Sequence, residues 1–144
     1  MYYIKTISKK FIPAEINYVK SITNNVENWI NLFESYTNVD IIYSDSDYVK
    51  FRLTTIDGDS WVSERRNISD FVVKGERLSP MYPFKFMHIK WTYESVDNGT
   101  LMIWEQEFEP DASLPKEAER KMYEYIMNHS KIEMSKIYNY IMTR

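Results

Sequence analysis

The stretch that decides the fold is PKEAERKMYEYIMNHSKIEMSKIYNYIMT, residues 115–143. Its apolar residues recur at intervals of three or four positions, which predicts a single long helix. Pro115 stands where the first turn of a helix tolerates proline. A helix of about 28 residues spans roughly 40 Å, which is long enough to cross a whole curved sheet.

One face of this predicted helix carries most of its apolar side chains. The stripe comprises Ala118, Met122, Tyr125, Ile126, His129, Ile132, Lys136, Ile137 and Tyr140. Most of the charged residues lie elsewhere on the helix. We therefore expect the stripe to pack against the rest of the protein.

Upstream of the helix, the pattern changes to a period of two, which is typical of strands. The predicted strands are 39–45, 48–56, 59–68, 70–78, 85–96 and 100–109. Short polar joints such as Asp57-Gly58-Asp59 separate them, and short joints make hairpins, so we expect an antiparallel meander. Residues 80–83 (Pro-Met-Tyr-Pro) form a stiffer apolar loop, which we expect at the lip of a cavity.

The N-terminal part is predicted to form a strand over residues 2–11, followed by two short helices. The first helix has Ile16, Val19 and Ile22 on one face, and the second has Asn25 as its N-cap with Val26, Trp29, Ile30 and Phe33 on one side. The order predicts an α+β fold: a curved seven-stranded antiparallel sheet that grips a long C-terminal helix, with two short helices after strand 1.

Length and composition narrow the class of protein. A chain of 144 residues predicts one domain, residues 1–144. The absence of cysteine excludes disulfides, thiolate nucleophiles and Cys-ligated zinc. With 3 glycines there is little room for loops that cradle phosphates, whereas 16% aromatic residues suit a bulky core or a pocket for a flat ligand.

The surroundings of the protein are also constrained. A net charge of −3 without a long basic block argues against a nucleic-acid partner. No apolar run approaches the roughly 18 residues of a membrane span, and the N-terminus lacks the features of a signal peptide. We therefore expect a cytoplasmic protein that does not bind a membrane.

The predicted strand SWVSERR, residues 60–66, carries the most chemistry. Alternate residues of a strand share a face, so Trp61, Ser63 and Arg65 point one way, opposite Glu64 and Arg66. If the first face is concave, Arg65 is a fixed cation in an apolar cleft. If that face is exposed, Arg65 belongs to a surface ion pair. The pattern alone leaves both interpretations open.

Two further strands present tryptophans in the same manner. Trp91 shares a face with Met87, Ile89 and Tyr93, and Trp104 shares one with Gln106 and Phe108. His88 falls on the opposite, outer face. A tryptophan-rich core and a lined pocket both fit this arrangement.

These segments together resemble a known family. The runs VENW (26–29), WVSER (61–65) and WEQEFEP (104–110), with Trp91, are similar to the bacterial aromatase/cyclases of aromatic polyketide pathways. Those proteins belong to the Bet v 1-like, START-related superfamily and have the helix-grip fold. The resemblance covers nearly the whole chain, and its most distinctive element is Trp-X-Ser-X-Arg on a strand.

The resemblance implies a cavity beside the long helix and a role for each matching residue. Arg65 and Ser63 match the catalytic pair, and Tyr36 matches an assisting aromatic residue. The pocket walls, which bind substrate, match Trp29, Trp61, Trp91, Trp104 and Gln106.

His129, on the helix stripe, is either a substrate-facing proton shuttle or a packing residue. No metal site is expected, since two histidines lack a third ligand at a suitable spacing.

The implied activity is polyketide cyclisation. The substrate is a poly-β-ketone carried on an acyl carrier protein and made by a minimal polyketide synthase. The enzyme directs a regiospecific aldol closure, and loss of water then aromatises the ring without a metal or redox cofactor. The alternatives are a non-catalytic carrier of a lipid or aromatic ligand and, more distantly, a regulatory or chaperone-like protein with a filled core.

Overall fold

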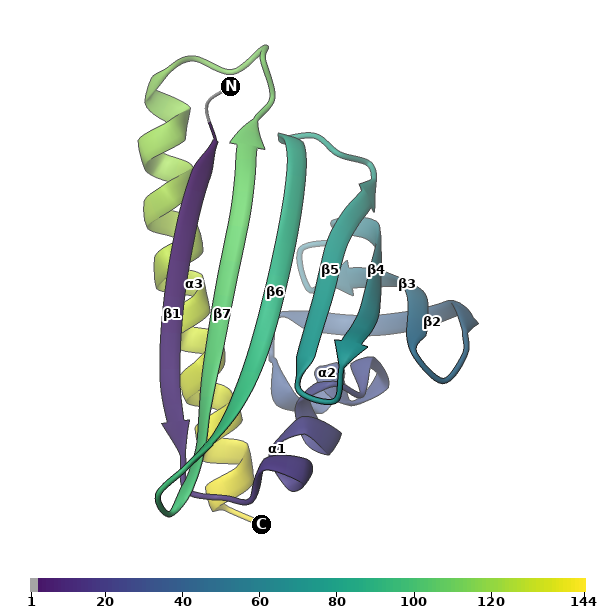
Figure 1. The fold of residues 1–144 in the computed structure, drawn as a ribbon. Coiled ribbons are helices and arrows are strands. Elements are labelled where there is room, and N and C mark those ends of the chain that lie inside the picture. The colour runs from purple at the N-terminus through teal and green to yellow at the C-terminus, as the bar shows by residue number, and fades with distance from the viewer. Residues whose placement is uncertain (1–2) are drawn as a thin grey trace.

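A curved antiparallel sheet with one long helix behind it dominates the computed structural model, which describes residues 3–144 (Figure 1). The strands are β1 (Ile4–Ile12), β2 (Tyr36–Ser44), β3 (Tyr48–Thr55), β4 (Ser60–Ser69), β5 (Val72–Ser79), β6 (Phe84–Val96) and β7 (Gly99–Pro110). The helices are α1 (Ile16–Thr23), the 3₁₀ turn η1 (Val26–Asn28), α2 (Trp29–Leu32) and α3 (Glu117–Met142). Tyr2, the first residue of the predicted N-terminal strand, lies outside the described residues.

The sheet is the predicted meander. Its order is β1-β7-β6-β5-β4-β3-β2, every neighbouring pair is antiparallel, and within residues 3–144 it contains the seven strands expected. The sheet curves, and in Figure 1 β2 and β3 run across the direction of β1 and β7. Register shifts in the β2–β3 and β4–β5 pairs accompany this change, since bulges increase the local bend. The N-terminal strand closes the other edge by pairing with β7.

Alternation along β7 shows how the sequence directs side chains to the interior. Thr100, Met102, Trp104, Gln106 and Phe108 are all buried, while the residues between them are partly exposed. Polar Glu105 and Glu107 therefore face the opposite side from Trp104 and Gln106. The predicted inner and outer faces of this strand are confirmed.

Helix α3 packs against β1 and β7, and its buried face shares Ile126 and Ile137 with the predicted stripe but otherwise differs from it. The buried residues are Ile126, Ser130, Glu133, Met134, Ile137 and Ile141. Tyr125 is 67% exposed and Ile132 is 46% exposed, so their predicted burial is wrong. After Ile126, most residues of the predicted stripe precede the buried residues by one position in the sequence. One position corresponds to a rotation of about 100° around a helix. The polar residues Ser130 and Glu133 therefore take the place assigned to Ile132.

The two short helices end and begin at adjacent asparagines. Glu15 caps α1, Asn24 ends it, and the side chain of Asn25 accepts a hydrogen bond from the backbone N–H of Glu27, as the predicted N-cap should. This break turns Trp29 into the interior. Ile30 was predicted on the same inner side and is instead 46% exposed. Within residues 3–144, no helix has the length and apolar character needed to cross a membrane.

Candidate active site

A cavity of about 140 Å³ lies between the inner face of the sheet and helix α3. Its wall includes every residue that the sequence singled out: Arg65, Ser63, Tyr36, Trp29, Trp61, Trp91, Trp104, Gln106 and His129. These residues come from α2, four strands and α3, and from positions up to 100 residues apart. The fold therefore brings them to one place, while their roles remain predictions.

Stacked tryptophans form the apolar part of the wall. The rings of Trp91 and Trp104 lie 4.4 Å apart between centroids and are inclined by 7°. Trp29 stacks on Trp91 at 5.8 Å, and its Nε1 donates a hydrogen bond of 2.9 Å to the carbonyl oxygen of Thr23. Because these three residues are at least 94% buried, they serve as core and as cavity lining together.

Arg65 is a buried cation without an acidic partner. Only 5% of its surface is exposed, and its guanidinium lies over Trp91 at 4.1 Å and over Trp29 at 5.1 Å from the ring centroids. Its Nη2 donates a 3.1 Å hydrogen bond to Oδ1 of Asn24. Across residues 3–144, its Nε has no hydrogen-bond acceptor and no carboxylate forms an ion pair with it.

The environment of Arg65 settles the question that the strand pattern left open, because the guanidinium faces the interior. Burial lowers the pKa of Arg65 to about 10, so the group still carries its charge near neutral pH. Gly75 on β5 lies opposite Arg65 in the register. A Cβ at Gly75 would stand 3.3 Å from Cγ of Arg65 and 3.0 Å from the backbone oxygen of Glu64, so glycine leaves the room that this arginine needs.

Tyr36 and Ser63 complete the predicted catalytic group. The Tyr36 ring stacks on Trp29 at 6.2 Å and meets Trp61 edge-on at 6.4 Å. Burial raises the pKa of the Tyr36 phenol, and the Glu133 carboxylate raises it further, so the hydroxyl keeps its proton. Ser63 is partly buried two residues before Arg65, on the same face of β4.

Helix α3 supplies a polar side to the cavity that the sequence reasoning only partly found. Gln106 donates a 2.7 Å hydrogen bond from Nε2 to the Ser130 hydroxyl, and His129 contacts Glu133 at 3.0 Å. Ser130 and Glu133 were not predicted as site residues, and neither was Asn24, the partner of Arg65. The spacing of His129 and Glu133, four residues apart on one helix, was the available signal for the pair.

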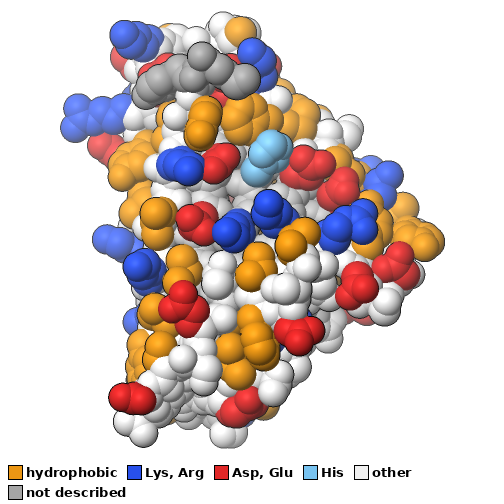
Figure 2. Space-filling view, in the orientation of Figure 1, with side chains coloured by type: hydrophobic (Ala, Val, Ile, Leu, Met, Phe, Trp, Pro, Cys, Tyr) orange, Lys and Arg blue, Asp and Glu red, His pale blue; other side chains and the backbone are white. Residues whose placement is uncertain are grey.

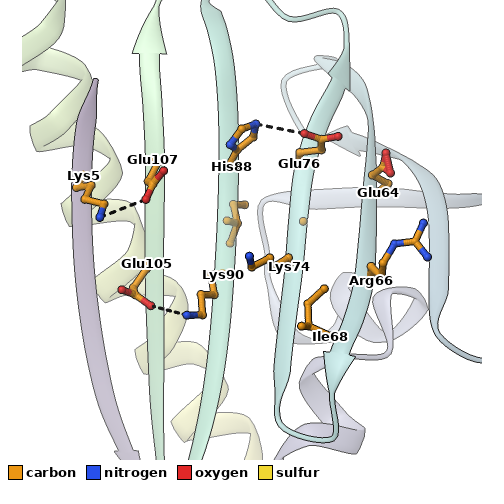
Figure 3. A pocket seen from close by; sticks show the side chains of 12 residues that line it. Lys5, Glu64, Arg66, Ile68, Lys74, Glu76, His88, Lys90, Glu105 and Glu107 are labelled. Atoms are coloured by element: carbon orange, nitrogen blue, oxygen red, sulfur yellow. Dashed lines mark ion pairs between the residues drawn. The ribbon is translucent and has the colours of Figure 1, made fainter. Parts of the chain in front are cut away.

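The outer face of the same strands holds a second hollow, of about 540 Å³, with a very different lining. Acidic and basic side chains alternate across this face (Figure 2). Lys5 pairs with Glu107 at 3.3 Å, His88 with Glu76 at 3.2 Å and Lys90 with Glu105 at 3.9 Å (Figure 3). The outward position predicted for His88 is therefore correct.

The loop at residues 80–83 does not line the cavity, so the predicted lip is wrong. Arg77 at the end of β5 binds this loop, donating hydrogen bonds of 2.7 Å to Pro80 O and 3.1 Å to Tyr82 O. The guanidinium of Arg77 also lies over Trp61 at 4.7 Å. The loop is thus tied to the cavity wall through one residue.

A sheet wrapped against a long helix, with an aromatic cavity between them, defines the helix-grip fold. The solved structure of the Zhui aromatase/cyclase from Streptomyces sp. R1128 has this fold, with a TM-score of 0.84 at 16% identity over 96% of this chain and 93% of that one. Ara h 8.0201 matches with a TM-score of 0.75 at 12% identity over 99% of this chain and all of the other. At these identities the likeness defines the fold alone.

Two sequence relatives define the family. A Streptomyces cyaneus protein, provisionally named as a polyketide cyclase, is 34% identical over 133 residues, which are 88% of this chain and 86% of the relative. A Streptomyces halstedii protein with the same provisional name is 40% identical over 99 residues, or 65% of this chain and 90% of the relative. The chain belongs to the polyketide cyclase family. No family model matches it.

Proposed function

We propose that this protein catalyses the regiospecific aldol cyclisation of a carrier-bound poly-β-ketone and the loss of water that aromatises the new ring. Membership of the polyketide cyclase family supports the general activity. The observation that carries the finer proposal is the buried, unpaired guanidinium of Arg65 in an aromatic cavity.

The isolation of Arg65 favours a catalytic role over a structural one. Burying a charge without a counter-ion costs several kcal/mol, and a protein that gained only packing from this side chain would do better with an apolar residue. The guanidinium donors that do not bind Asn24 suit an oxygen that becomes negative during reaction. In an aldol closure, that oxygen is the enolate oxygen or the carbonyl oxygen under attack.

The size of the cavity bears on how much of the substrate it holds. An apolar cavity of about 150 Å³ accommodates one benzene molecule, and this cavity measures about 140 Å³. We therefore expect the segment that closes into a six-membered ring to occupy the space between Trp61 and Trp91, with the rest of the chain outside. Confinement between flat rings brings one methylene against one carbonyl, which is how orientation selects a product.

Tyr36 and Ser63 have supporting roles in this scheme. The protonated phenol of Tyr36 donates its proton to the new alkoxide. Ser63 holds a carbonyl of the substrate or the departing water beside Arg65. Aldol closure and dehydration move protons and carbon bonds without net electron transfer, so the proposed chemistry requires no redox cofactor.

The proposed substrate arrives as a thioester on an acyl carrier protein, made by a minimal polyketide synthase in the cytoplasm. Contact with the carrier should be weak and transient, at the small end of interface sizes. Carrier proteins are usually acidic, so basic residues near the cavity should promote the contact. Neutralising them should slow product formation from the carrier-bound substrate more than from a small soluble thioester.

Replacing Arg65 tests the proposal. With a reconstituted ketosynthase and carrier protein, the Arg65→Ala variant should lose about 100-fold or more of the directed cyclisation and leave the spontaneous product mixture. Arg65→Lys should recover little, because a point charge does not reproduce the planar guanidinium. Arg66→Ala is the matched control, since Arg66 is exposed on the outer face and stacks on Tyr48.

The product profiles, read by chromatography, distinguish the alternatives. A wild-type profile from Arg65→Ala contradicts the catalytic assignment. If wild-type protein leaves the spontaneous mixture unchanged while a flat aromatic ligand still quenches its tryptophan fluorescence, the protein is a ligand carrier instead. If such a ligand does not quench the fluorescence of the folded protein, the cavity is not a binding site.

A further inference from the structure

We propose that Glu133 is a second catalytic residue, whose carboxylate removes the proton from the substrate methylene that attacks. The inference rests on the proposed function and deepens it, since Arg65 remains charged near neutral pH and cannot act as this base. An aldol closure requires a proton acceptor, and the roles assigned above to Tyr36 and Ser63 do not supply one. His129, which also lines the cavity, has its Nε2 directed at Glu133.

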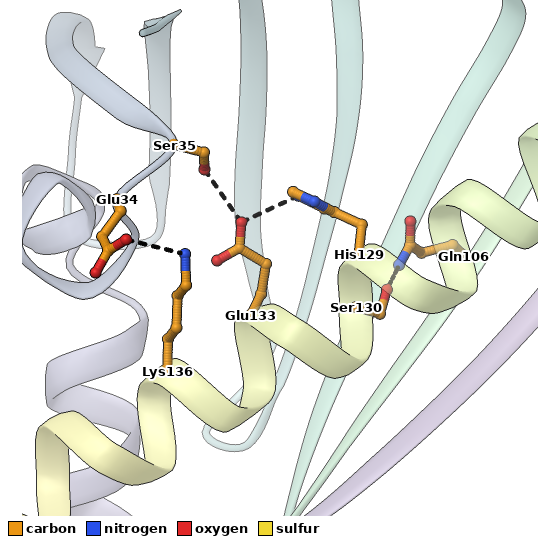
Figure 4. A network of polar contacts seen from close by, with 7 residues as sticks. All are labelled: Glu34, Ser35, Gln106, His129, Ser130, Glu133 and Lys136. Carbon is orange, nitrogen blue, oxygen red and sulfur yellow. Dashed lines mark hydrogen bonds and ion pairs between the residues drawn. The ribbon is translucent and has the colours of Figure 1, made fainter.

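The two oxygens of Glu133 have different surroundings (Figure 4). Oε1 accepts a hydrogen bond from the Ser35 hydroxyl at 3.2 Å and contacts Nε2 of His129 at 3.0 Å. Oε2 is buried and has no hydrogen-bond partner in the part of the chain that the structure describes. Glu133 as a whole is 4% exposed and lines the cavity together with Arg65 and Tyr36.

A purely structural role explains the contacts of only one of the two oxygens of the Glu133 carboxylate, Oε1. The contacts of Oε1 tie α3 to the segment before β2, and a glutamine oxygen would make the same contacts without a buried charge. Leaving a buried carboxylate oxygen unsatisfied is costly, and such atoms in native proteins call for an explanation. A base that must accept a proton from a bound ligand needs one such oxygen, held ready and shielded from water.

The neighbours of Glu133 suit proton transfer. His129 has a side chain 38% exposed, against 5% for that of Glu133, so the imidazole stands between the buried carboxylate and solvent. Its ring stacks on Tyr125 at 5.6 Å, which fixes its orientation. Glu133 also acts on Tyr36, whose pKa it raises in addition to the larger effect of burial, so the carboxylate and the phenol are electrostatically coupled. His129 and Ser35 are accordingly positioning residues.

Every proton that moves in the proposed aldol closure has a donor and an acceptor. The C–H bond of a methylene between two carbonyls breaks, its proton passes to Oε2, and its electron pair delocalises into a carbonyl oxygen bound by Arg65. The enolate carbon then bonds to the second carbonyl carbon, and the resulting alkoxide takes the proton of Tyr36. Protonated Glu133 returns its proton to the Tyr36 phenolate, which restores both groups.

Hydrogen–deuterium exchange tests the proton abstraction apart from ring closure. The probe is the acetoacetyl thioester of N-acetylcysteamine in D₂O, with exchange at its methylene followed by NMR. Wild-type protein should accelerate exchange over buffer, and Glu133→Gln should reduce the acceleration about 100-fold or more, as expected for a lost general base. Glu133→Asp keeps a carboxylate and should recover part of it. Glu124→Gln, an exposed carboxylate on the same helix, should match wild type.

The controls separate this inference from the proposed function. Quenching of tryptophan fluorescence by 2-naphthol should be the same for Glu133→Gln and wild type, which shows that the cavity is intact. Exchange by Glu133→Gln at the wild-type rate overturns the inference, even if Arg65 directs cyclisation. Carboxylate-dependent exchange without directed cyclisation supports Glu133 and contradicts the proposed function. If Glu133→Gln fails to fold, Glu133→Asp decides: exchange slower than wild type but above buffer supports the base, and an unchanged rate overturns it.

Discussion

Neighbouring arginines on β4 occupy opposite environments. Arg65 is buried between indole rings and has no acidic partner within residues 3–144, whereas Arg66 lies on the charged outer face, stacked on the Tyr48 ring. The contrast extends over β4 to β7, whose inner sides carry Trp61, Trp91 and Trp104 and whose outer sides carry paired acids and bases. One layer of backbone thus separates an apolar compartment from a solvated one.

The comparison teaches that the size of a hollow is a poor guide to chemistry. The outer hollow is larger, about 540 Å³ against about 140 Å³, but three ion pairs satisfy much of its charge and water screens the rest. The inner cavity is smaller and contains charged atoms without partners, Nε of Arg65 and Oε2 of Glu133, as far as residues 3–144 show. If the proposed function holds, unsatisfied buried charge is therefore a better indicator of the site than volume.

The largest expected difference between the faces concerns the stability of the fold. Trp91→Ala removes a ring that packs on Trp104 and Trp29, and should lower the free energy of unfolding by about 3–5 kcal/mol. Lys90→Ala, the adjacent outward residue, should change it by less than about 1 kcal/mol. Urea unfolding followed by circular dichroism measures both. Equal losses would mean that the inner aromatic stack contributes no more than a surface charge.

A smaller effect is expected where the inner face is most crowded. Gly75→Ala forces its new methyl group against Cγ of Arg65 and the backbone of Glu64, and such overpacking should cost about 1–3 kcal/mol. Because the guanidinium is displaced, the Gly75→Ala variant should also lose most of the directed cyclisation activity. Lys74→Ala, exposed and one residue away, is the control and should retain both. Full activity in Gly75→Ala would show that Arg65 tolerates displacement.

The smallest effect is expected on the outer face itself. A double-mutant cycle on Lys5 and Glu107, paired at 3.3 Å with side chains 58% and 39% exposed, should give a coupling energy below about 1 kcal/mol. Raising the salt concentration should reduce it further. A coupling of several kcal/mol, insensitive to salt, would mean that the outer face is shielded from solvent and that the contrast drawn here is too strong.

The strands were predictable because the alternation of side chains along a strand determines both which face packs into the core and which residues can line the cavity. Alternation along 60–66 and 100–109 assigned Trp61, Arg65, Trp104 and Gln106 to one side, and turns of fixed length then set the antiparallel order. The inward or outward position of that side was not predictable for Arg65 from alternation alone. It depends on Trp29 and Asn24, which lie in sequence about 40 residues away.

The phase of the long helix was not predictable for a related reason. Ile132 and Tyr125 are apolar but exposed, and Ser130 and Glu133 are polar but buried. A pattern that assigns apolar residues to the interior therefore misplaces these four residues, although it correctly predicts the burial of Ile126 and Ile137. The polar residues are buried because Gln106 and Ser35 form hydrogen bonds with them and His129 contacts Glu133, and those partners come together only after folding.

The β5–β6 ladder stops at Glu76 and His88, and beyond it Arg77 donates hydrogen bonds to two backbone carbonyls of the connecting loop, those of Pro80 and Tyr82. Local opening begins where few hydrogen bonds must break together. Two exposed hydrogen bonds of about 1 kcal/mol each are a small part of a global stability of about 5–15 kcal/mol. We therefore expect residues 77–84 to open locally more readily than the rest of the sheet.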